Sequence, residues 1–206
     1  MTPSLHDTLR RNLRAGLVGR DAERALFAGA LVADGLPFHV VHVYGPGGVG
    51  KTTLLHEFER VAAEAGVPAA LLDLRDVEPT PDGFVTAVDA AFARAPARGG
   101  RRVLLLDTFE AAQGLDGWLQ RVFLPGQADS LLVVVAGRNP PAPSWTAGAA
   151  WAGAVVTMPL GNLSDAEAEA FLDRRDVPKD ARRAVLAFTH GYPLALALVA
   201  ERFRQR

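Results

Sequence analysis

Residues 45–52 of this chain read, in order, Gly45, Pro46, Gly47, Gly48, Val49, Gly50, Lys51 and Thr52. The run matches the pattern G-x-x-x-x-G-K-[ST] in full. Glycines at these positions let the backbone fold tightly, so that successive N–H groups point inward and can bind phosphate oxygens. A Val-rich apolar run, 38–44, ends directly before it, and a helical pattern begins near Gly50. These residues therefore predict a strand, a phosphate-binding loop and a helix, in that order.

The chemistry of the loop gives separate tasks to three side chains. We expect the Lys51 ammonium to reach the β- and γ-phosphates of a nucleotide and the Thr52 hydroxyl to bind Mg²⁺. Thr53 is expected to add a contact to the α-phosphate. The following helix N-terminus carries a partial positive charge that favours the same anion. The alternative is a glycine-rich turn with an incidental lysine, but Lys51 and Lys179 are the only lysines of the chain, which argues against coincidence.

Five short apolar runs alternate with helical patterns along most of the chain. The runs are 38–44, 67–74, 102–107, 130–136 and 154–158. Each is almost continuously apolar, which is typical of strands buried on both faces of a parallel sheet. Helical periodicity follows the first three runs, at 54–65, 84–92 and 115–122. This order predicts an α/β domain over residues 1–160, a P-loop NTPase fold with a parallel sheet sandwiched by helices.

No further strand pattern follows residue 160. Ser164, with Glu167 three residues later, predicts a capping box at the start of a helix. Pro178 and Pro193 each stand at the start of another helical pattern. We expect residues 161–206 to form a small, partial helical lid subdomain and the chain to be part of a longer protein.

Three polar residues are expected at the edge of the sheet that holds the loop. Asp107 ends the run 102–107, and the carboxyl ends of parallel strands are where open α/β sheets bind ligands. We expect Asp107 to help hold Mg²⁺, usually through water. Glu110 is a candidate base for the attacking water, or else a capping or surface acid. Arg138 follows the run 130–136 and is a candidate contact to the γ-phosphate, or else a surface arginine.

Composition excludes several classes of protein. The chain has 206 residues, of which 49% are hydrophobic and 22% charged, as in an ordinary globular domain. It has no cysteine, so disulfides and thiolate zinc sites are excluded. A formal net charge of −1 argues against nucleic acid and membrane surfaces as partners. The longest apolar stretches are far shorter than the roughly 18 residues that span a bilayer. Without a secretion signal, the expected compartment is the cytoplasm.

Histidines and tryptophans are interpreted as packing residues. His39 and His42 fall within the run 38–44 and have no metal-ligand spacing to nearby acids. Trp145 and Trp151 lie in a long, proline-containing loop, and we expect them to anchor it rather than to stack on a ligand.

These features together resemble the STAND branch of the AAA+-related P-loop ATPases, which includes the NB-ARC proteins. The resemblance extends from Leu17 to Phe203. Residues 17–23, LVGRDAE, look like the hhGRxxE motif of that family and are called the GR motif below. The P-loop and the LLLD and AGR strand ends also match. Residues 190–195, HGYPLA, look like the GxP motif of the helical lid.

The resemblance implies roles for further residues. Val18, with its neighbour Gly19, would contact the adenine, and Arg20 would support that loop or the ribose. Pro193 would pack against the base or sugar from the lid side, and Arg138 matches the sensor arginine of the family. The family acts as a nucleotide switch, in which ADP holds a closed form and ATP exchange opens it for oligomerisation or signalling. The implied partners are therefore other domains of the full-length protein and a nucleotide-dependent homo-oligomer.

The sequence departs from the family pattern next to the second strand motif. Many relatives carry two adjacent acids there, whereas Thr108 follows Asp107. The departure leaves Glu110 as a substitute candidate for the catalytic base. We expect a slow ATPase, because we expect residues supplied in trans and the effector domains to lie outside this chain. Two other functions stay open. One is a nucleotide-binding interaction scaffold that does not hydrolyse ATP, and the other is a nucleic-acid-dependent ATPase such as a helicase or loader.

Overall fold

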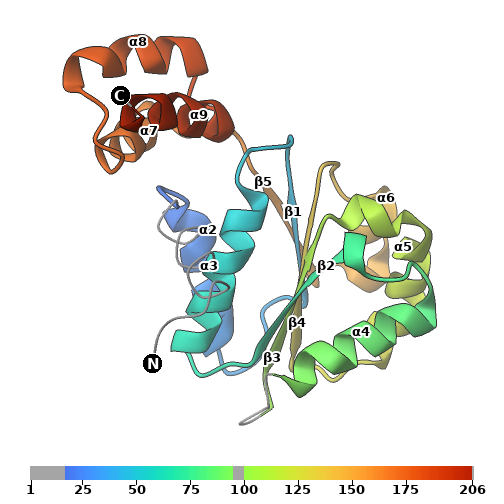
Figure 1. Ribbon diagram of the computed structural model, residues 1–206. Coiled ribbons are helices and arrows are strands. Elements are labelled where there is room, and N and C mark those ends of the chain that lie inside the picture. Colours follow the sequence, from blue (N-terminus) through green and yellow to red (C-terminus); the bar gives the residue numbers. More distant parts are fainter. Residues whose placement is uncertain (1–16, 95–99, 206) are drawn as a thin grey trace.

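The computed structural model describes residues 17–94 and 100–205, which form an α/β core and a helical lid (Figure 1). Among these residues, five parallel strands make one sheet in the order β2-β3-β4-β1-β5. The strands are β1 (Val40–Tyr44), β2 (Ala69–Asp73), β3 (Arg102–Asp107), β4 (Leu131–Gly137) and β5 (Val155–Pro159). The predicted α/β P-loop fold is confirmed. Residues 1–16 of the predicted first domain lie outside the described part of the chain.

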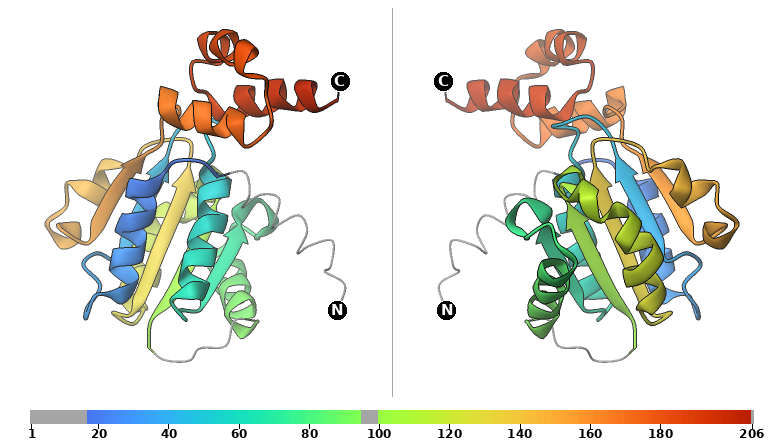
Figure 2. Two further views of the ribbon diagram at one scale, coloured as in Figure 1. Left: turned by 90° about the vertical axis from the view of Figure 1, so that its left-hand side faces the viewer. Right: turned by 90° about the vertical axis from the view of Figure 1, so that its right-hand side faces the viewer.

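Helices cover both faces of the sheet (Figure 2). On one face, α2 (Asp21–Val32) and α3 (Lys51–Glu64) enclose a core that contains Phe58. On the other face, α4 (Pro81–Ala93) and the short helices after β3 pack around a core that contains Phe84. Because apolar side chains are buried on both faces, the strands read as continuous apolar runs rather than alternating ones.

The helix predicted over 115–122 is confirmed as helical backbone, but it is not one regular α-helix, and one of its buried residues differs. The backbone is α-helical over Asp116–Trp118 and π-helical over Leu119–Phe123. Leu115 and Leu119 are buried as predicted, whereas Val122 is 57% exposed and Phe123 is buried in its place. Residues four apart share one face of a helix, so Phe123 lies on the same side as Leu119. The short elements on this side of the chain are η1 (Leu74–Asp76), η2 (Phe109–Leu115), α5 (Asp116–Trp118), η3 (Leu119–Phe123) and η4 (Leu124–Gly126).

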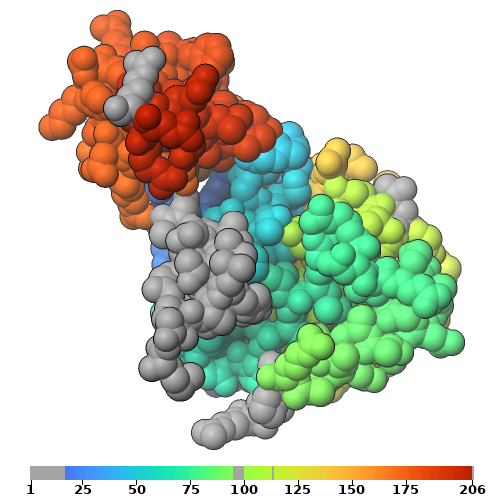
Figure 3. Space-filling view, in the orientation of Figure 1, coloured from blue at the N-terminus to red at the C-terminus, as the bar shows by residue number. Residues whose placement is uncertain are grey.

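The lid consists of α7 (Asp165–Asp173), α8 (Lys179–Thr189) and α9 (Pro193–Arg204). Ser164 and Glu167 form the predicted capping box, Pro178 precedes α8, and Pro193 opens α9. The lid has its own apolar core, to which Val18 of the GR motif contributes. It stands beyond the carboxyl ends of the strands and protrudes from the core as a separate lobe (Figures 2 and 3). None of the helices described, in lid or core, is long and apolar enough to cross a bilayer.

A tryptophan anchors the long connection between β4 and β5, as predicted. The connection contains α6 (Pro143–Thr146) and η5 (Ala149–Trp151). Trp145 is 1% exposed, and its indole N–H donates a 2.8 Å hydrogen bond to the Asp116 carboxylate. Its ring centroid lies 6.4 Å from that of His42, which is also buried. His42 is therefore a core histidine, as its place in a strand run predicts.

The buried His42 predicts a pH dependence of stability. Burial lowers the pKa of His42 from 6.5 to about 4, and the Asp116 carboxylate only partly offsets this effect. Because the unfolded chain then binds the proton first, the native state loses stability as the pH falls from 6.5 toward 4. We expect the free energy of unfolding to fall by about 2 kcal/mol between about pH 7 and pH 5 through this residue alone.

Urea denaturation of the wild type and of His42→Leu at both pH values measures this contribution. The leucine variant removes the titration, while the carboxylates that titrate over the same interval remain in both proteins. The free energy of unfolding of the variant should therefore depend less on pH by the stated amount. The same pH dependence in both proteins would contradict the prediction.

Candidate functional site

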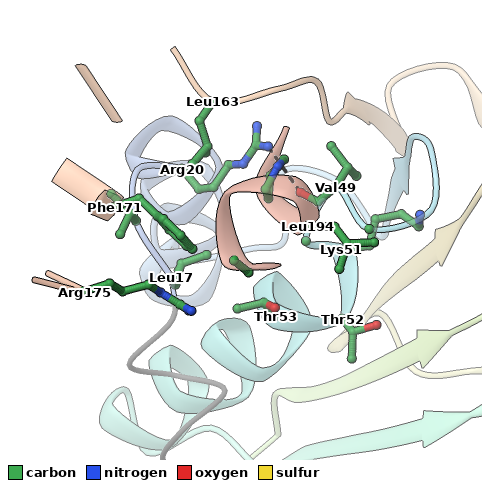
Figure 4. A pocket seen from close by; sticks show the side chains of 15 residues that line it. Leu17, Arg20, Val49, Lys51, Thr52, Thr53, Leu163, Phe171, Arg175 and Leu194 are labelled. Atoms are coloured by element: carbon green, nitrogen blue, oxygen red, sulfur yellow. Dashed lines mark hydrogen bonds between the residues drawn. The ribbon is translucent and has the colours of Figure 1, made fainter. Parts of the chain in front are cut away.

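A cavity of about 340 Å³ lies between the core and the lid (Figure 4). Three segments that are far apart in sequence line it: the GR motif, the phosphate-binding loop with the start of α3, and the lid. Its volume is within the range of pockets that hold small organic ligands. The lining residues are Leu17, Val18, Arg20, Gly48, Val49, Gly50, Lys51, Thr52, Thr53, Leu163, Phe171, Arg175, Pro193, Leu194 and Ala197.

The structure brings many of the predicted site residues to this cavity and leaves others outside its lining. The predicted residues that line it are Val18, Arg20, Gly48, Val49, Gly50, Lys51, Thr52, Thr53 and Pro193. The others adjoin these along the chain or lie at the ends of β3 and β4. They are Gly19, Gly45, Pro46, Gly47, Asp107, Glu110 and Arg138.

The start of α3 faces the cavity without a side-chain cap. Gly50 is the N-cap residue and has a φ of +99°, a left-handed conformation that favours glycine. The first N–H groups of a helix lack an intrahelical partner and carry a partial positive charge. A helix start of this kind fits a phosphate group.

The Lys51 ammonium is held within the loop. Its Nζ donates hydrogen bonds to the carbonyl oxygens of Gly45 at 2.8 Å and Pro46 at 3.0 Å. Burial lowers the pKa of Lys51, and the Glu110 and Asp107 carboxylates oppose this effect. The hydrogen-bond partners of this positive charge are thus neutral carbonyl groups, and an anion would make stronger, charge-assisted bonds to it.

Thr52 and Asp107 meet beneath the loop. The Thr52 hydroxyl donates a 2.7 Å hydrogen bond to Asp107 Oδ2, which joins α3 to the end of β3. The Thr108 backbone N–H donates to the other carboxylate oxygen at 2.8 Å. A hydroxyl beside a carboxylate fits Mg²⁺, which binds few protein oxygens and keeps water and phosphate ligands. No cluster of three or more His, Cys, Asp or Glu side chains suited to a metal exists among the described residues.

Glu110 and Arg138 are paired with each other. Arg138 Nε lies 3.0 Å from Glu110 Oε1, and the Arg138 backbone N–H donates to Oε2 at 3.3 Å. They follow the neighbouring strands β3 and β4, so the parallel sheet brings them together. The Arg138 side chain is 70% exposed, so water screens the pair and its stabilising effect is small. Sequence reasoning places both at this edge but does not predict their contact.

Arg20 connects the GR motif to the loop and to the segment that leads into the lid. Its guanidinium donates to the carbonyl of Gly161 at 2.5 Å and, at 3.5 Å, to that of Val49. Its backbone N–H donates to Glu167 Oε1 at 3.2 Å. These contacts join the GR motif to the phosphate-binding loop and to the start of the lid.

Glu167 belongs to the site although sequence reasoning identifies it only as a helix cap. One carboxylate oxygen makes that cap by accepting from Ser164, and the other accepts from Arg20. Gly19 lies so close that a Cβ there would be 2.0 Å from Glu167 Oε1. Burial acts to raise the pKa of Glu167, but the hydrogen bonds from Ser164 and Arg20 outweigh it and lower the pKa. This carboxylate therefore stays ionised and ties the lid to the GR motif.

The lid contributes two further features to the cavity. The Tyr192 hydroxyl donates a hydrogen bond to the Gly47 carbonyl, and a Cβ on Gly48 would lie 2.7 Å from the same hydroxyl. At another wall, the Arg175 guanidinium lies over the Phe171 ring, 4.3 Å from its centroid (Figure 4). Tyr192 lies within the GxP segment, so the sequence carried a signal for it. Phe171 reads only as part of the apolar face of a lid helix, and Arg175, in the turn after α7, has no sequence signal.

Comparisons with known proteins bear on the family and the fold. The sequence profile of a family described as AAA ATPase domain matches residues 16–190. The fold is similar to that of the Thermotoga maritima RuvB Holliday junction branch migration motor, with a TM-score of 0.59, 18% identity, and coverage of 99% of this chain and 65% of that one. It is also similar to the Aeropyrum pernix Orc1 protein in complex with DNA, with a TM-score of 0.60, 16% identity, and coverage of 94% and 63%.

These likenesses show the fold alone, because the identities are low. The chain also spans less than two thirds of the length of either structure, at 65% and 63%. Among curated protein sequences, none matches this chain.

The hydrogen bond from the Arg20 backbone N–H to Glu167 predicts slow hydrogen exchange of that amide. Glu167→Ala removes the acceptor of the Arg20 N–H, so this amide should exchange with solvent about tenfold faster, since a hydrogen bond to a charged group contributes about 1.5–3 kcal/mol. Hydrogen–deuterium exchange of the peptide that contains the GR motif measures this. Ser164→Ala is the control, because it removes the helix cap and leaves the Arg20 contact. Equal exchange in Glu167→Ala and Ser164→Ala would contradict the prediction.

Proposed function

The chain belongs to the AAA ATPase domain family, and from this premise we propose that it is an ATP- and ADP-binding regulatory module of the STAND type. The observation that carries the proposal is the cavity between core and lid. Val18 and Arg20 of the GR motif and Pro193 of the GxP segment, the two segments that narrow the resemblance to STAND proteins, line it together with the P-loop. A nucleotide in this cavity would touch all three segments at once.

Each wall of the cavity suits a different part of a nucleotide. The amides at the start of α3 and the Lys51 ammonium would bind the phosphates. Apolar side chains from the GR motif and the lid, among them Val18 and Pro193, would enclose the base and the sugar. Thr52 and Asp107 would hold Mg²⁺, which neutralises phosphate charge when it is bound.

We propose that hydrolysis is slow. In-line attack on the γ-phosphate needs a group that orients or deprotonates water. Thr108 places a hydroxyl where a second acid would stand, and the Glu110 carboxylate is engaged by Arg138. Arg138 can stabilise charge on the γ-phosphate alongside Lys51 once it leaves Glu110, and the exposed pair is weak enough to allow this. The proposal of slow hydrolysis therefore rests on the missing second acid.

Two contacts offer a physical basis for a switch that controls signalling or assembly. Tyr192 of the lid bonds to Gly47 of the loop, and Glu167 of the lid bonds to Arg20. If the lid can take up two positions, a nucleotide shifts the equilibrium between them by the difference in its binding free energy for the two. The proposed partners are the other domains of a longer protein and further copies of the chain.

Nucleotide binding should raise the melting temperature. Ligand at 100 times its Kd adds about 2.7 kcal/mol to the free energy of unfolding, a shift of roughly 5–11 °C for a domain of this size. We expect ATP with Mg²⁺, and ADP, to produce this shift in the wild type. Lys51→Ala should lose most of it, because the phosphates then lack their cationic partner. Differential scanning fluorimetry measures both.

Lys179→Ala is the matched control, because Lys179 starts α8 and is outside the cavity lining. It should keep the full shift. Release of any co-purified nucleotide by denaturation, followed by chromatography, shows whether the purified site is empty. An empty wild-type protein whose melting ignores both nucleotides would contradict the proposal.

Hydrolysis by the isolated chain should be slower than about one turnover per second, at or below the low end of ordinary enzyme rates. Glu110→Gln should lower the rate by about a hundredfold if Glu110 acts as the base. Release of phosphate under single-turnover conditions measures this, with Glu64→Gln, an exposed acid on α3, as the control. Many turnovers per second would contradict slow hydrolysis. An unchanged slow rate in Glu110→Gln would favour the non-hydrolysing scaffold or another base.

A nucleic-acid-dependent ATPase is the second candidate. It is favoured by the structural neighbours described as a Holliday junction motor and as a complex with DNA. The formal net charge of −1 argues against it, because DNA binding rests largely on basic side chains that neutralise phosphates. Adding duplex DNA to the same assay separates the two functions, since stimulation of hydrolysis would favour this candidate over the switch.

A further inference from the structure

A second cavity, of about 200 Å³, lies on the sheet face that carries α6, and it shares no lining residue with the cavity described above. Glu110 and Arg138 lie at its wall and belong to the proposed hydrolysis, whereas its other lining residues have no part in nucleotide binding or hydrolysis. Its walls combine aromatic rings with acidic and imidazole groups. The lining residues that matter here are His42, Phe109, Glu110, Asp116, Arg138 and Trp145.

His42 brings an unpaired polar atom to this cavity. Its side chain is 3% exposed, and Nδ1 has no hydrogen-bond partner within residues 17–94 and 100–205. The rings of Phe109 and Trp145 surround it, with centroids at 6.0 and 6.4 Å from its own. Because burial lowers the pKa of His42 to about 4, the imidazole is neutral near pH 7 and does not repel a cation. A buried nitrogen without a partner is unfavourable, and a ligand that pairs with it removes that cost.

Asp116 adds a negative charge beside His42. Its Oδ1 accepts the indole N–H of Trp145 at 2.8 Å, which orients the carboxylate. No arginine, lysine or histidine side chain in the described part of the chain forms an ion pair with it. Glu110, the other acid of this cavity, is neutralised by Arg138 at 3.0 Å. The cavity as a whole therefore carries one uncompensated negative charge.

We propose that this cavity binds a small organic cation of the guanidinium or alkylammonium class. Asp116 supplies the opposite charge, and the rings of Phe109 and Trp145 form the aromatic part of the wall. The unpaired nitrogen of His42 accepts one N–H of the ligand. The volume is below the roughly 300–1,000 Å³ of pockets for drug-sized ligands, so the cation has few heavy atoms.

Other ligand classes fit these walls less well. An anion would be repelled by the Asp116 carboxylate, and an apolar molecule would leave the charge of Asp116 without an opposite charge and His42 Nδ1 without a hydrogen bond. A metal ion would need more ligands, and no cluster of three or more metal-ligating side chains exists among the described residues. The cation is either a free molecule or the side chain of an arginine or lysine from a second copy of this chain.

Methylguanidinium and N-methylurea test the proposal, because they have similar shapes and differ in charge. Titration of the labelled full chain, followed by NMR at the His42 ring and the Trp145 indole N–H, should give a saturable shift with methylguanidinium, with a Kd on the order of 1 mM. N-methylurea should give none. Lys51→Ala should bind methylguanidinium as the wild type does, so the result is independent of the proposed nucleotide binding.

Asp116→Asn is the decisive variant, because it removes the charge and keeps an oxygen that can accept from Trp145. It should weaken methylguanidinium binding about tenfold, which is about 1.4 kcal/mol. Asp89→Asn, an exposed acid on α4, is the matched control and should bind as the wild type does. His42→Leu should also weaken binding, and thermal melting shows that each variant is folded.

Sedimentation velocity distinguishes the two sources of the cation. Self-association that methylguanidinium reverses and Asp116→Asn lacks identifies a side chain of a second copy, whereas a monomer that binds methylguanidinium identifies a free cation. Three results would overturn the proposal: no saturable shift at His42 or Trp145, equal binding by folded Asp116→Asn, or equal binding of N-methylurea.

Discussion

The parallel direction of the strands is the constraint on which this structure depends. Because every strand points the same way, the loop after β1, Asp107 at the end of β3 and Arg138 after β4 all come to one edge of the sheet. β4 lies between β1 and β3, so residues far apart in the chain lie side by side there. The phosphate-binding loop, the hydroxyl–carboxylate contact beneath it and the Glu110–Arg138 pair all follow from this arrangement.

Hydrogen bonds to the main chain hold the three walls of the main cavity together. Arg20 donates to the carbonyls of Gly161 and Val49, and Tyr192 donates to that of Gly47. Glu167 accepts the backbone N–H of Arg20. Every residue has a backbone carbonyl, and every residue except proline has a backbone N–H, whatever its side chain. These bonds therefore connect the lid to the phosphate-binding loop and the GR motif through backbone groups. A ligand that changes the loop would therefore act directly on the position of the lid.

Charge is distributed unevenly around the strand ends. Lys51 has neutral carbonyl partners, Glu110 and Arg138 neutralise each other, and Asp116 has no cationic partner among the described residues. Lys51 with its neutral partners favours an anion, and Asp116 without a cationic partner favours a cation. The two cavities therefore suit ligands of opposite charge. The Glu110–Arg138 pair is linked to both cavities. The Glu110 carboxylate opposes the lowering of the pKa of Lys51 in the first cavity, and it also lines the second.

The strands, the phosphate-binding loop and the lid helices can be predicted from the sequence, because each depends on a local pattern. Continuous apolar runs, the glycine spacing of residues 45–52 and the capping box at Ser164 need no knowledge of distant residues. Packing decided that Phe123 rather than Val122 is buried, because the Phe123 ring joins the core beside Phe84. Only the tertiary structure decided which functional groups meet. Glu167 is an example. The capping-box pattern predicts the partner of one of its carboxylate oxygens, Ser164, whereas the fold brings the partner of the other, the Arg20 backbone N–H, from a distant part of the chain.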